Sequence, residues 1–182
     1  MSIAITGNPG VGKHSISDKI AQKFNLNVID INKIAKDSGL FEVNQNTNDV
    51  DTEKLKKVLK EKISKNSLII GHLAPYVLEK NQVEKIIILR RNPYELLDVY
   101  KQRKYNDKKS KENTGSEILG IITHDTIREF QEKAFQIDTS EKSIQEVTEK
   151  AINVISGDTQ TEEVDWLDLV TKNNDFKKFF DD

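Results

Sequence analysis

Seven residues near the N-terminus have the types and the order of a phosphate-binding loop. Residues 7–13 read Gly-Asn-Pro-Gly-Val-Gly-Lys, which fits the pattern G-x-x-x-x-G-K. An apolar, strand-like run precedes them and a helix-like pattern follows, which is the context that the motif requires. Glycines let backbone N–H groups turn inward, the helix N-terminus adds partial positive charge, and Lys13 reaches the outer phosphates. An ordinary glycine-rich turn lacks this register, so the sequence predicts a site for a nucleoside triphosphate.

The predicted phosphate contacts extend two residues beyond the lysine. The general motif places Ser or Thr directly after the lysine, where its hydroxyl coordinates magnesium. Here His14 follows Lys13, and Ser15 comes one position later. We therefore expect Mg²⁺ to arrive with ATP and assign no direct protein ligand to it, and we interpret His14 as a helix-surface residue. The expected phosphate-binding residues are Asn8, Pro9, Gly10, Val11, Gly12, Lys13, His14 and Ser15.

Metal-hydrolase chemistry has no support in the sequence. The histidines His14, His72 and His124 have no ligand-like spacing, and the chain contains no cysteine. The absence of cysteine also excludes disulfides and thiol nucleophiles, and it fits a chain that works in the reducing cytosol. Two basic runs, residues 101–104 and 108–111, form a local patch that reads most simply as a solvated helix end and loop.

Five short apolar runs punctuate longer polar segments with helical spacing. Strands that are buried on both faces read as nearly continuous apolar runs, so this alternation indicates a parallel sheet covered by helices. The fold class is therefore α/β, with five parallel strands flanked by helices. The strands are expected at residues 3–6, 28–31, 68–71, 86–89 and 134–137.

Helix positions follow from apolar spacing and from start signals. One helix is expected directly after the loop, one after Asp51, one from Pro93, and two more in the second half of the chain. The Asn- and Thr-rich residues 43–49 are expected to form a loop. The helix after the loop is predicted at residues 13–24, and the two in the second half of the chain at residues 115–132 and 143–155.

Length and charge predict one domain with an appended tail. The 182 residues suffice for a single α/β core over residues 1–156. Beyond Gly157, residues 157–182 are acidic and carry apolar residues at helical spacing; docking on the parent domain is favoured over partner binding. The net charge of −2 argues against a broad nucleic-acid-binding face. No run is long enough to cross a bilayer, and we expect a cytoplasmic monomer.

Several segments together resemble the adenylate kinase isoenzyme 6 family in its archaeal form. The likeness covers residues 1–155, and the tail residues 164–167 also look like archaeal endings. The resemblance implies a nucleoside-monophosphate-kinase-like fold, transfer of the ATP γ-phosphate to AMP or related monophosphates, and ATPase activity. It further implies a role in small ribosomal subunit maturation, with a small-subunit ribosomal protein and pre-ribosomal RNA as partners. The segments that carry it are residues 7–13, 71–72, 89–93 and 103–109.

The resemblance also implies roles for individual residues. Lys13 would stabilise charge on the transferring phosphoryl group, and Lys36 would contact the acceptor phosphate within a monophosphate-binding segment at about residues 30–66. Residues 103–114 would form a lid, in which Arg103 binds phosphate and Asn106 and Lys109 shape the segment. His72, after the third strand, would orient water or the metal shell. Arg90 and Arg91 end the next strand, either to contact nucleotide or to cap local structure.

One departure from the family pattern bears on turnover. Family members carry an acidic residue at the end of the third strand, just ahead of the histidine, whereas this chain has Ile70 and Gly71 there. Loss of a metal-organising carboxylate would weaken transition-state stabilisation more than nucleotide binding. Asp30 or Asp51 are the candidates that would compensate from neighbouring segments.

Three functions fit these observations. The first is a nucleoside monophosphate (adenylate) kinase with ATPase activity that acts in ribosome biogenesis and rRNA processing. The second is a nucleotide-switched assembly factor with little turnover, which the missing acid and the acidic tail favour. The third, a kinase for a small metabolite such as a hydroxy acid, shares the loop and fold, but the lid segment argues against it.

Overall fold

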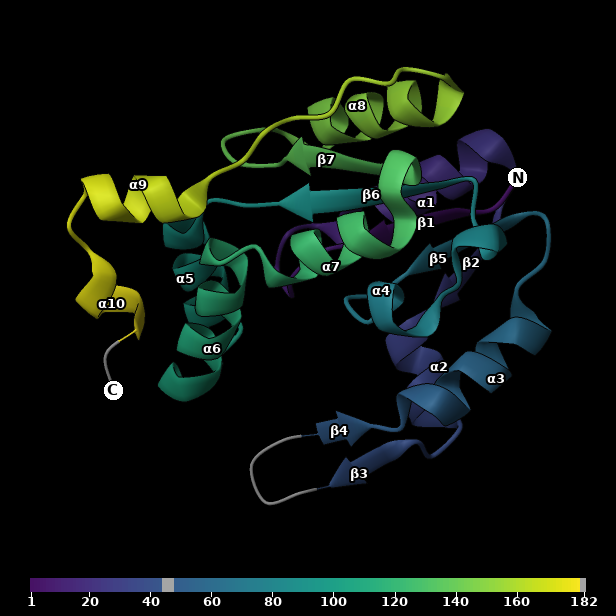
Figure 1. Cartoon of the computed structure of the whole chain (residues 1–182), viewed down its shortest axis with the longest axis horizontal. Coiled ribbons are helices and arrows are strands. Elements are labelled where there is room, and N and C mark those ends of the chain that lie inside the picture. Colours follow the sequence, from purple (N-terminus) through teal and green to yellow (C-terminus); the bar gives the residue numbers. More distant parts are fainter. Residues whose placement is uncertain (44–47, 181–182) are drawn as a thin grey trace.

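A computed structural model describes residues 1–43 and 48–180 of the chain. At its centre lies a five-stranded, all-parallel sheet in the order β2-β5-β1-β6-β7 (Figure 1). The predicted fold class and its five strands are confirmed, with bounds that differ by a residue or two from those expected. The strands are β1 (Ile3–Thr6), β2 (Asn27–Asp30), β5 (Ser67–Ile70), β6 (Lys85–Arg90) and β7 (Ala134–Asp138).

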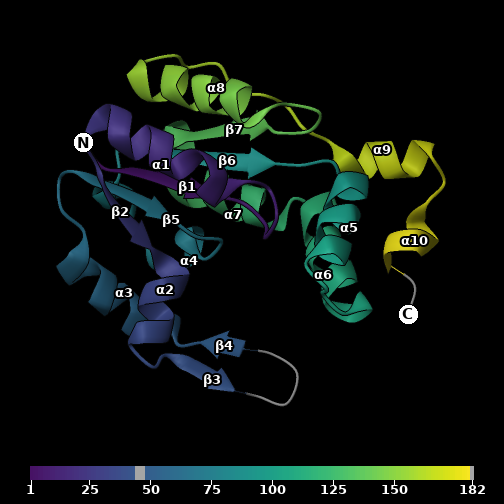
Figure 2. The same cartoon turned by 180° about the vertical axis from the view of Figure 1, so that it is seen from behind.

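Helices cover both faces of the sheet, and the sheet divides the core into two apolar layers (Figures 1 and 2). Alternate residues of β1 show the division, because Ile3 and Ile5 pack into one layer and Ala4 into the other. One layer is closed by α1 (Lys13–Phe24), α5 (Pro93–Gln102) and α8 (Ile144–Ser156). The other is closed by α2 (Ile31–Asp37), α3 (Thr52–Lys62), α4 (Ala74–Val77) and α7 (Ile121–Phe130).

Side-chain caps explain why several helices begin where the sequence predicts. Asp51 accepts a hydrogen bond from the Lys54 amide at the start of α3, and Asn92 caps α5 one residue ahead of Pro93. Ser143 and Glu146 form a reciprocal capping box at α8. Each cap satisfies backbone N–H groups that have no partner within the helix.

The single helix expected over residues 115–132 is wrong, because two helices occupy this part of the chain. Helix α6 (Asp107–Ile118) begins inside the predicted lid, where Asn106 accepts a hydrogen bond from the Lys109 amide. Gly120 then adopts a left-handed φ of 62°, which ends one helix and starts α7 in a new direction. The 3₁₀ turns η1 (Lys80–Gln82) and η2 (Gln131–Lys133) are short connections that the sequence pattern missed.

The loop expected over residues 43–49 needs a correction at both ends. Strands β3 (Phe41–Val43) and β4 (Asn48–Val50) pair as an antiparallel hairpin that projects from the sheet edge beside α2 and α3 (Figure 1). The remaining residues of that prediction, 44–47, lie outside the described residues. None of the described helices combines the length and apolar character that a membrane crossing requires.

The segment after α8 runs back across the molecule and packs on it. Its extended part follows β7, where the Gln136 carbonyl accepts a hydrogen bond from the Glu162 amide and the Asp138 amide donates to the Glu162 carboxylate. These contacts cover part of the open edge of the sheet. Helices α9 (Trp166–Lys172) and α10 (Phe176–Phe180) then lie against α6 (Figures 1 and 2).

Candidate active site

The phosphate loop connects β1 to α1 and has the backbone geometry that the motif requires. Gly7, Gly10 and Gly12 adopt φ angles of 128°, 91° and 101°, a region that other residues rarely occupy. At Gly7 the position of an added Cβ would also lie 2.3 Å from the Leu89 carbonyl oxygen. All three glycines are therefore required by conformation, and Gly7 also by its close approach to β6.

Lys13 is buried at the first turn of α1 and turns back over the loop. Its Nζ donates to the carbonyl oxygens of Gly7 at 2.7 Å and Asn8 at 2.8 Å. Burial lowers the pKa of Lys13 to about 7; the Glu117 carboxylate opposes this shift, and the Arg103 cation adds to it. A triphosphate bound in the loop would restore the charged form by direct attraction.

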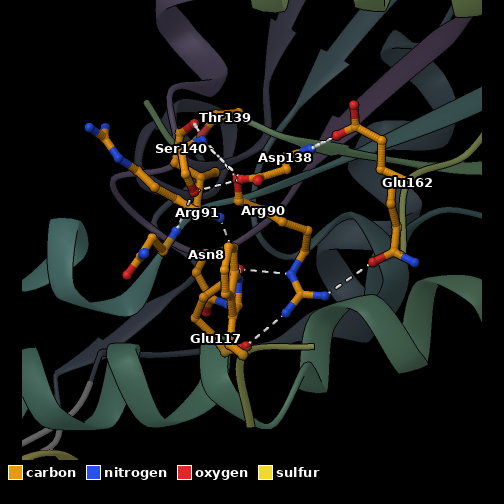
Figure 3. Close-up of polar contacts among 12 residues, drawn as sticks. Asn8, Arg90, Arg91, Glu117, Asp138, Thr139, Ser140 and Glu162 are labelled. Carbon is orange, nitrogen blue, oxygen red and sulfur yellow. Dashed lines mark hydrogen bonds and ion pairs between the residues drawn. The ribbon is translucent and has the colours of Figure 1, made fainter. Parts of the chain in front are cut away.

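Contacts from other elements hold the loop from outside. The Tyr100 hydroxyl donates to the Pro9 carbonyl at 2.5 Å, and Arg91 Nη1 donates to the Gly10 carbonyl at 3.4 Å. The Asn8 amide donates to Glu117 Oε2 at 2.7 Å. Figure 3 shows Asn8 between the end of β6 and the helix that carries Glu117. The loop is thus fixed by α5, α6 and the end of β6, far from it in sequence.

A cavity of about 1140 Å³ opens in front of the loop and joins three parts of the molecule. On the loop side it is lined by most of the predicted phosphate contacts, although Val11 is buried in the core instead. On the lid side, Arg103, Asn106 and Lys109 are exposed and line the cavity, as does Tyr105, which stacks on Tyr100. The third side contributes Asn32, Val50, His72, Leu73 and Tyr76.

His72 lies at the carboxyl edge of the sheet, two residues after β5, and faces the cavity. Burial lowers its pKa to about 4, and the nearby charge of Lys13 acts in the same direction. The imidazole is therefore neutral at pH 7. A neutral ring donates one hydrogen bond and accepts another, which suits the orienting role that the sequence implied better than that of a cation.

The end of β5 presents no carboxylate, and position 71 has no room for a side chain. Ile70 is buried in the core, and an added Cβ at Gly71 would lie 2.7 Å from Ile31 Cβ. Asp30 ends the neighbouring strand β2 directly beside Ile70. Its Oδ1 caps α2, and its Oδ2 lies 2.8 Å from Nε2 of His14. Asp51 instead caps α3, and neither Asp30 nor Asp51 lines the cavity.

The residues beside the loop fit magnesium that is carried by a nucleotide. Mg²⁺ keeps several waters and takes one or two carboxylates in addition to substrate phosphates. Asp30 offers one carboxylate at the sheet edge, and Ser15 offers a hydroxyl in the cavity. Among residues 1–43 and 48–180, no group of three or more His, Cys, Asp or Glu side chains gathers as a protein-only metal site.

Some predicted residues lie elsewhere. Lys36 is exposed on the last turn of α2 and does not line the cavity, whereas Asn32, one turn earlier on the same helix, does. Arg90 is buried and pairs with Glu117, Nε to Oε1 at 2.7 Å, so it caps local structure instead of facing the cavity. Arg91 pairs with Glu95 at 2.9 Å.

The sequence pattern did not identify Glu117, although a signal for it exists. Glu117 is a lone carboxylate on an otherwise small or apolar face of α6, together with Thr114, Gly115 and Ile118, all of them buried. A carboxylate on such a face is almost always paired. Its partners, however, come from distant segments that the spacing of α6 does not identify.

Comparison with known proteins agrees with this geometry. Residues 3–120 match the family model described as "AAA domain". A protein from Saccharolobus islandicus named "Putative adenylate kinase" is 32% identical over 157 residues, which cover 84% of this chain and 82% of that protein. A protein of the same name from Methanosarcina barkeri is 35% identical over 187 residues, which cover 93% of this chain and 100% of that protein.

Solved structures support the fold. The YorR protein of Bacillus subtilis, in complex with phosphorylated GDP, has a TM-score of 0.62 at 15% identity, over 86% of this chain and 96% of that one. Shikimate kinase from Aquifex aeolicus has a TM-score of 0.55 at 16% identity, over 86% of this chain and 97% of that one. From the matched residues 3–120 and the relatives above 30% identity, the chain belongs to the adenylate-kinase-like family of P-loop proteins.

Proposed function

We propose that this chain transfers the γ-phosphoryl group of ATP to a nucleoside monophosphate, with AMP as the expected acceptor. The observation that carries the proposal is the single cavity shared by the phosphate loop, the sheet edge at His72 and the lid residue Arg103. A donor and an acceptor bound in one cavity react as an effectively unimolecular pair. The relatives named "Putative adenylate kinase" support this choice of substrates.

On the donor side, backbone N–H groups of the loop and the N-terminus of α1 would bind the phosphates of ATP. Lys13 would then exchange its contacts with the Gly7 and Asn8 carbonyl oxygens for contacts with the outer phosphates. The positive charge that it brings would stabilise the charge on the transferring group.

On the acceptor side, the apolar side chains of Val50, Leu73 and Tyr76 provide a surface for a nucleobase. Tyr76 is held in place because its hydroxyl donates to Asp125 at 2.7 Å. Lys36 lies on the same face of α2 as the cavity residue Asn32, four positions later. We propose that the monophosphate-binding segment, at about residues 30–66, closes on the cavity and so brings the Lys36 amine to the acceptor phosphate.

The reaction itself would need little covalent participation by the protein. An oxygen of the acceptor phosphate forms a bond to the γ-phosphorus, the bond between that phosphorus and the β–γ bridging oxygen breaks, and the donor leaves as ADP. A phosphate monoester is already largely ionised at pH 7, so no strong general base is required. Neutral His72 would orient the acceptor, and Arg103 would contact the transferring group as the lid excludes water.

Magnesium carried by ATP would neutralise phosphate charge during the transfer. Asp30 and Ser15 are the residues that we propose to hold its water shell. Asp30 stands beside the apolar end of β5, so it is the carboxylate available to replace the missing acid. Asp30→Asn keeps the α2 cap and should lower turnover more than ATP affinity. An Asp30→Asn enzyme with unchanged turnover would leave Asp30 as a cap only.

The decisive experiment measures ADP formation from ATP and magnesium, with and without AMP, alongside phosphate release. Turnover that depends on AMP supports the kinase, and Lys13→Ala should abolish it. Tight ATP binding without AMP-dependent turnover would instead support a second candidate, the nucleotide-switched assembly factor that binds a small-subunit ribosomal protein. The apolar end of β5, at Ile70 and Gly71, is the observation that favours this second function.

A further inference from the structure

Glu117 on the lid helix α6 is a buried carboxylate that collects donors from three separate parts of the chain. Its side chain is 1% exposed. Oε2 accepts from Asn8 Nδ2 at 2.7 Å. Oε1 accepts from Arg90 Nε at 2.7 Å, the Arg91 amide at 3.1 Å and Trp166 Nε1 at 3.1 Å. A buried carboxylate is strongly unfavourable unless it is saturated in this way, so each donor constrains the others.

The bond to Asn8 connects this junction to the nucleotide site. Asn8 is 3% exposed and stands between Gly7 and Pro9 in the phosphate loop. Its carbonyl oxygen accepts a hydrogen bond from Lys13 Nζ at 2.8 Å. Figure 3 shows Asn8, Arg90 and Glu117 together at this junction. Glu117 does not line the cavity, so its influence on a bound nucleotide is indirect, through its bond to Asn8 and through its charge near Lys13.

The bond to Trp166 connects the same carboxylate to residues 158–180, here called the C-terminal segment. Val170 and Phe179 of that segment are buried against Ile118, on the same helix as Glu117. This packing holds the indole of Trp166 within hydrogen-bonding distance of Glu117, which directly precedes Ile118 on α6. The state of the C-terminal segment therefore bears directly on a carboxylate that holds the phosphate loop.

We propose that Glu117 is a positioning residue for ATP binding, which couples the phosphate loop through Asn8 to the docked C-terminal segment through Trp166. The inference rests on the nucleotide site of the proposed function but concerns binding, not transfer. It predicts that a change at the far side of α6, remote from the cavity, weakens ATP binding without affecting binding of the acceptor. A purely structural role for the C-terminal segment would instead reduce the amount of folded protein and leave its affinity unchanged.

The first test compares two aromatic substitutions in the full-length protein. Trp166→Phe keeps a packed ring but removes the N–H that Glu117 accepts. Tyr94→Phe is the matched control, because it removes a hydroxyl that bonds Asp175 and Asn173 of the same segment without touching Glu117. Calorimetric titration with ATP and magnesium should give a Kd raised about fivefold in Trp166→Phe. The Kd of Tyr94→Phe should stay within about twofold of the wild type.

Equal effects of the two substitutions, or no effect of Trp166→Phe, would overturn the coupling. A second variant, Glu117→Gln, presents an amide where Asn8 now finds an acceptor, and should raise the Kd for ATP about tenfold or more. Its KM for AMP should be unchanged, whereas a loss of folded protein would lower the number of ATP sites and leave the Kd for ATP unchanged. Because ATP binding is measured without turnover, a wild-type protein that binds ATP but fails to phosphorylate AMP would refute only the proposed function.

Discussion

Lys13 is buried at the first turn of α1 and its pKa lies far below that of a free lysine. The same burial that prepares the amine for phosphate opposes its charge when no phosphate is bound. In the unfolded chain the lysine would titrate near its ordinary value of 10.5, against about 7 in the folded protein. The residue that the motif requires for function therefore lowers the stability of the free protein at neutral pH.

Replacing this lysine should separate activity from stability. Lys13→Met should abolish phosphoryl transfer and, at pH 7, stabilise the nucleotide-free protein by about 1 to 2 kcal/mol. Between pH 7 and 10.5 the unfolded wild type binds more protons at Lys13 than the folded protein does. Wild-type stability at this site therefore rises with pH, and the advantage of Lys13→Met should shrink. Urea unfolding of both proteins at pH 7 and pH 9 measures the difference in their stability at each pH. Equal stability of the two proteins at pH 7 would contradict the expected effect of Lys13.

The low pKa also predicts a proton linked to ATP binding. At pH 8 most Lys13 side chains of the free protein are neutral, because their pKa is about 7. A polyphosphate attracts the charged form and raises that pKa again, so ATP binding at pH 8 should take up about one proton. At pH 6 the lysine is already charged, so it takes up no proton when ATP binds. Titration calorimetry in buffers of different ionisation enthalpy counts the protons, with Lys13→Met as the reference that lacks the uptake.

At the scale of elements, the contact between β5 and α2 decides what the sheet edge presents to the nucleotide. Gly71 follows β5 and lies against Ile31, the first residue of α2. Asp30, one residue earlier, caps the same helix. The apolar end of β5 and the carboxylate at the end of β2 are therefore parts of one packing arrangement.

A side chain at position 71 should disturb this contact. An added Cβ would lie 2.7 Å from Ile31 Cβ, an atom attached directly to the backbone, so α2 must move. Gly71→Ala should lower the free energy of unfolding by about 1 to 3 kcal/mol and also weaken turnover through the displaced Asp30. Gly39→Ala is a useful reference, because its φ of 64° brings conformational strain without any neighbour within 4 Å of the added Cβ. If Gly71→Ala kept the turnover of the wild type, the position of α2 would have no effect on catalysis.

Over the whole molecule, the C-terminal segment connects the edge of the sheet to helix α6. It lies along β7 through Glu162 and covers α6 through Val170 and Phe179 (Figure 1). Such a segment has fewer buried contacts than the sheet, so it should open before the rest of the fold unfolds.

Phe179→Ala should open that segment selectively. Phe179 is 1% exposed, and deletion of a buried phenylalanine costs about 3 to 5 kcal/mol where the site cannot collapse. We expect faster amide hydrogen exchange over residues 158–180 and in α6, with protection of β1 and β6 unchanged. Phe180→Ala, at a position that is 42% exposed, provides the control. Faster exchange spread evenly through the sheet would show that the segment is part of the global folding unit.

The spacing of residue types along the chain predicted much of the fold and the nucleotide loop. The phosphate motif, the apolar runs of the five strands and the start of α5 at Pro93 depend on neighbours in sequence, and these predictions are confirmed. The break at Gly120 was missed, because a single glycine in a helical pattern is often tolerated. The hairpin strands β3 and β4 were missed because each has only three residues, too few for an alternating pattern to stand out.

The phosphate loop after β1 and the parallel sheet flanked by helices follow from the sequence alone, since both depend on residues that are close together along the chain. Only the tertiary structure decided which residues support that loop. Glu117 is 109 positions from Asn8 and 49 from Trp166, and no periodicity relates such distant residues. It also placed Asp30 rather than Asp51 beside the end of β5, because neighbouring strands of a parallel sheet bring their carboxyl ends to one edge.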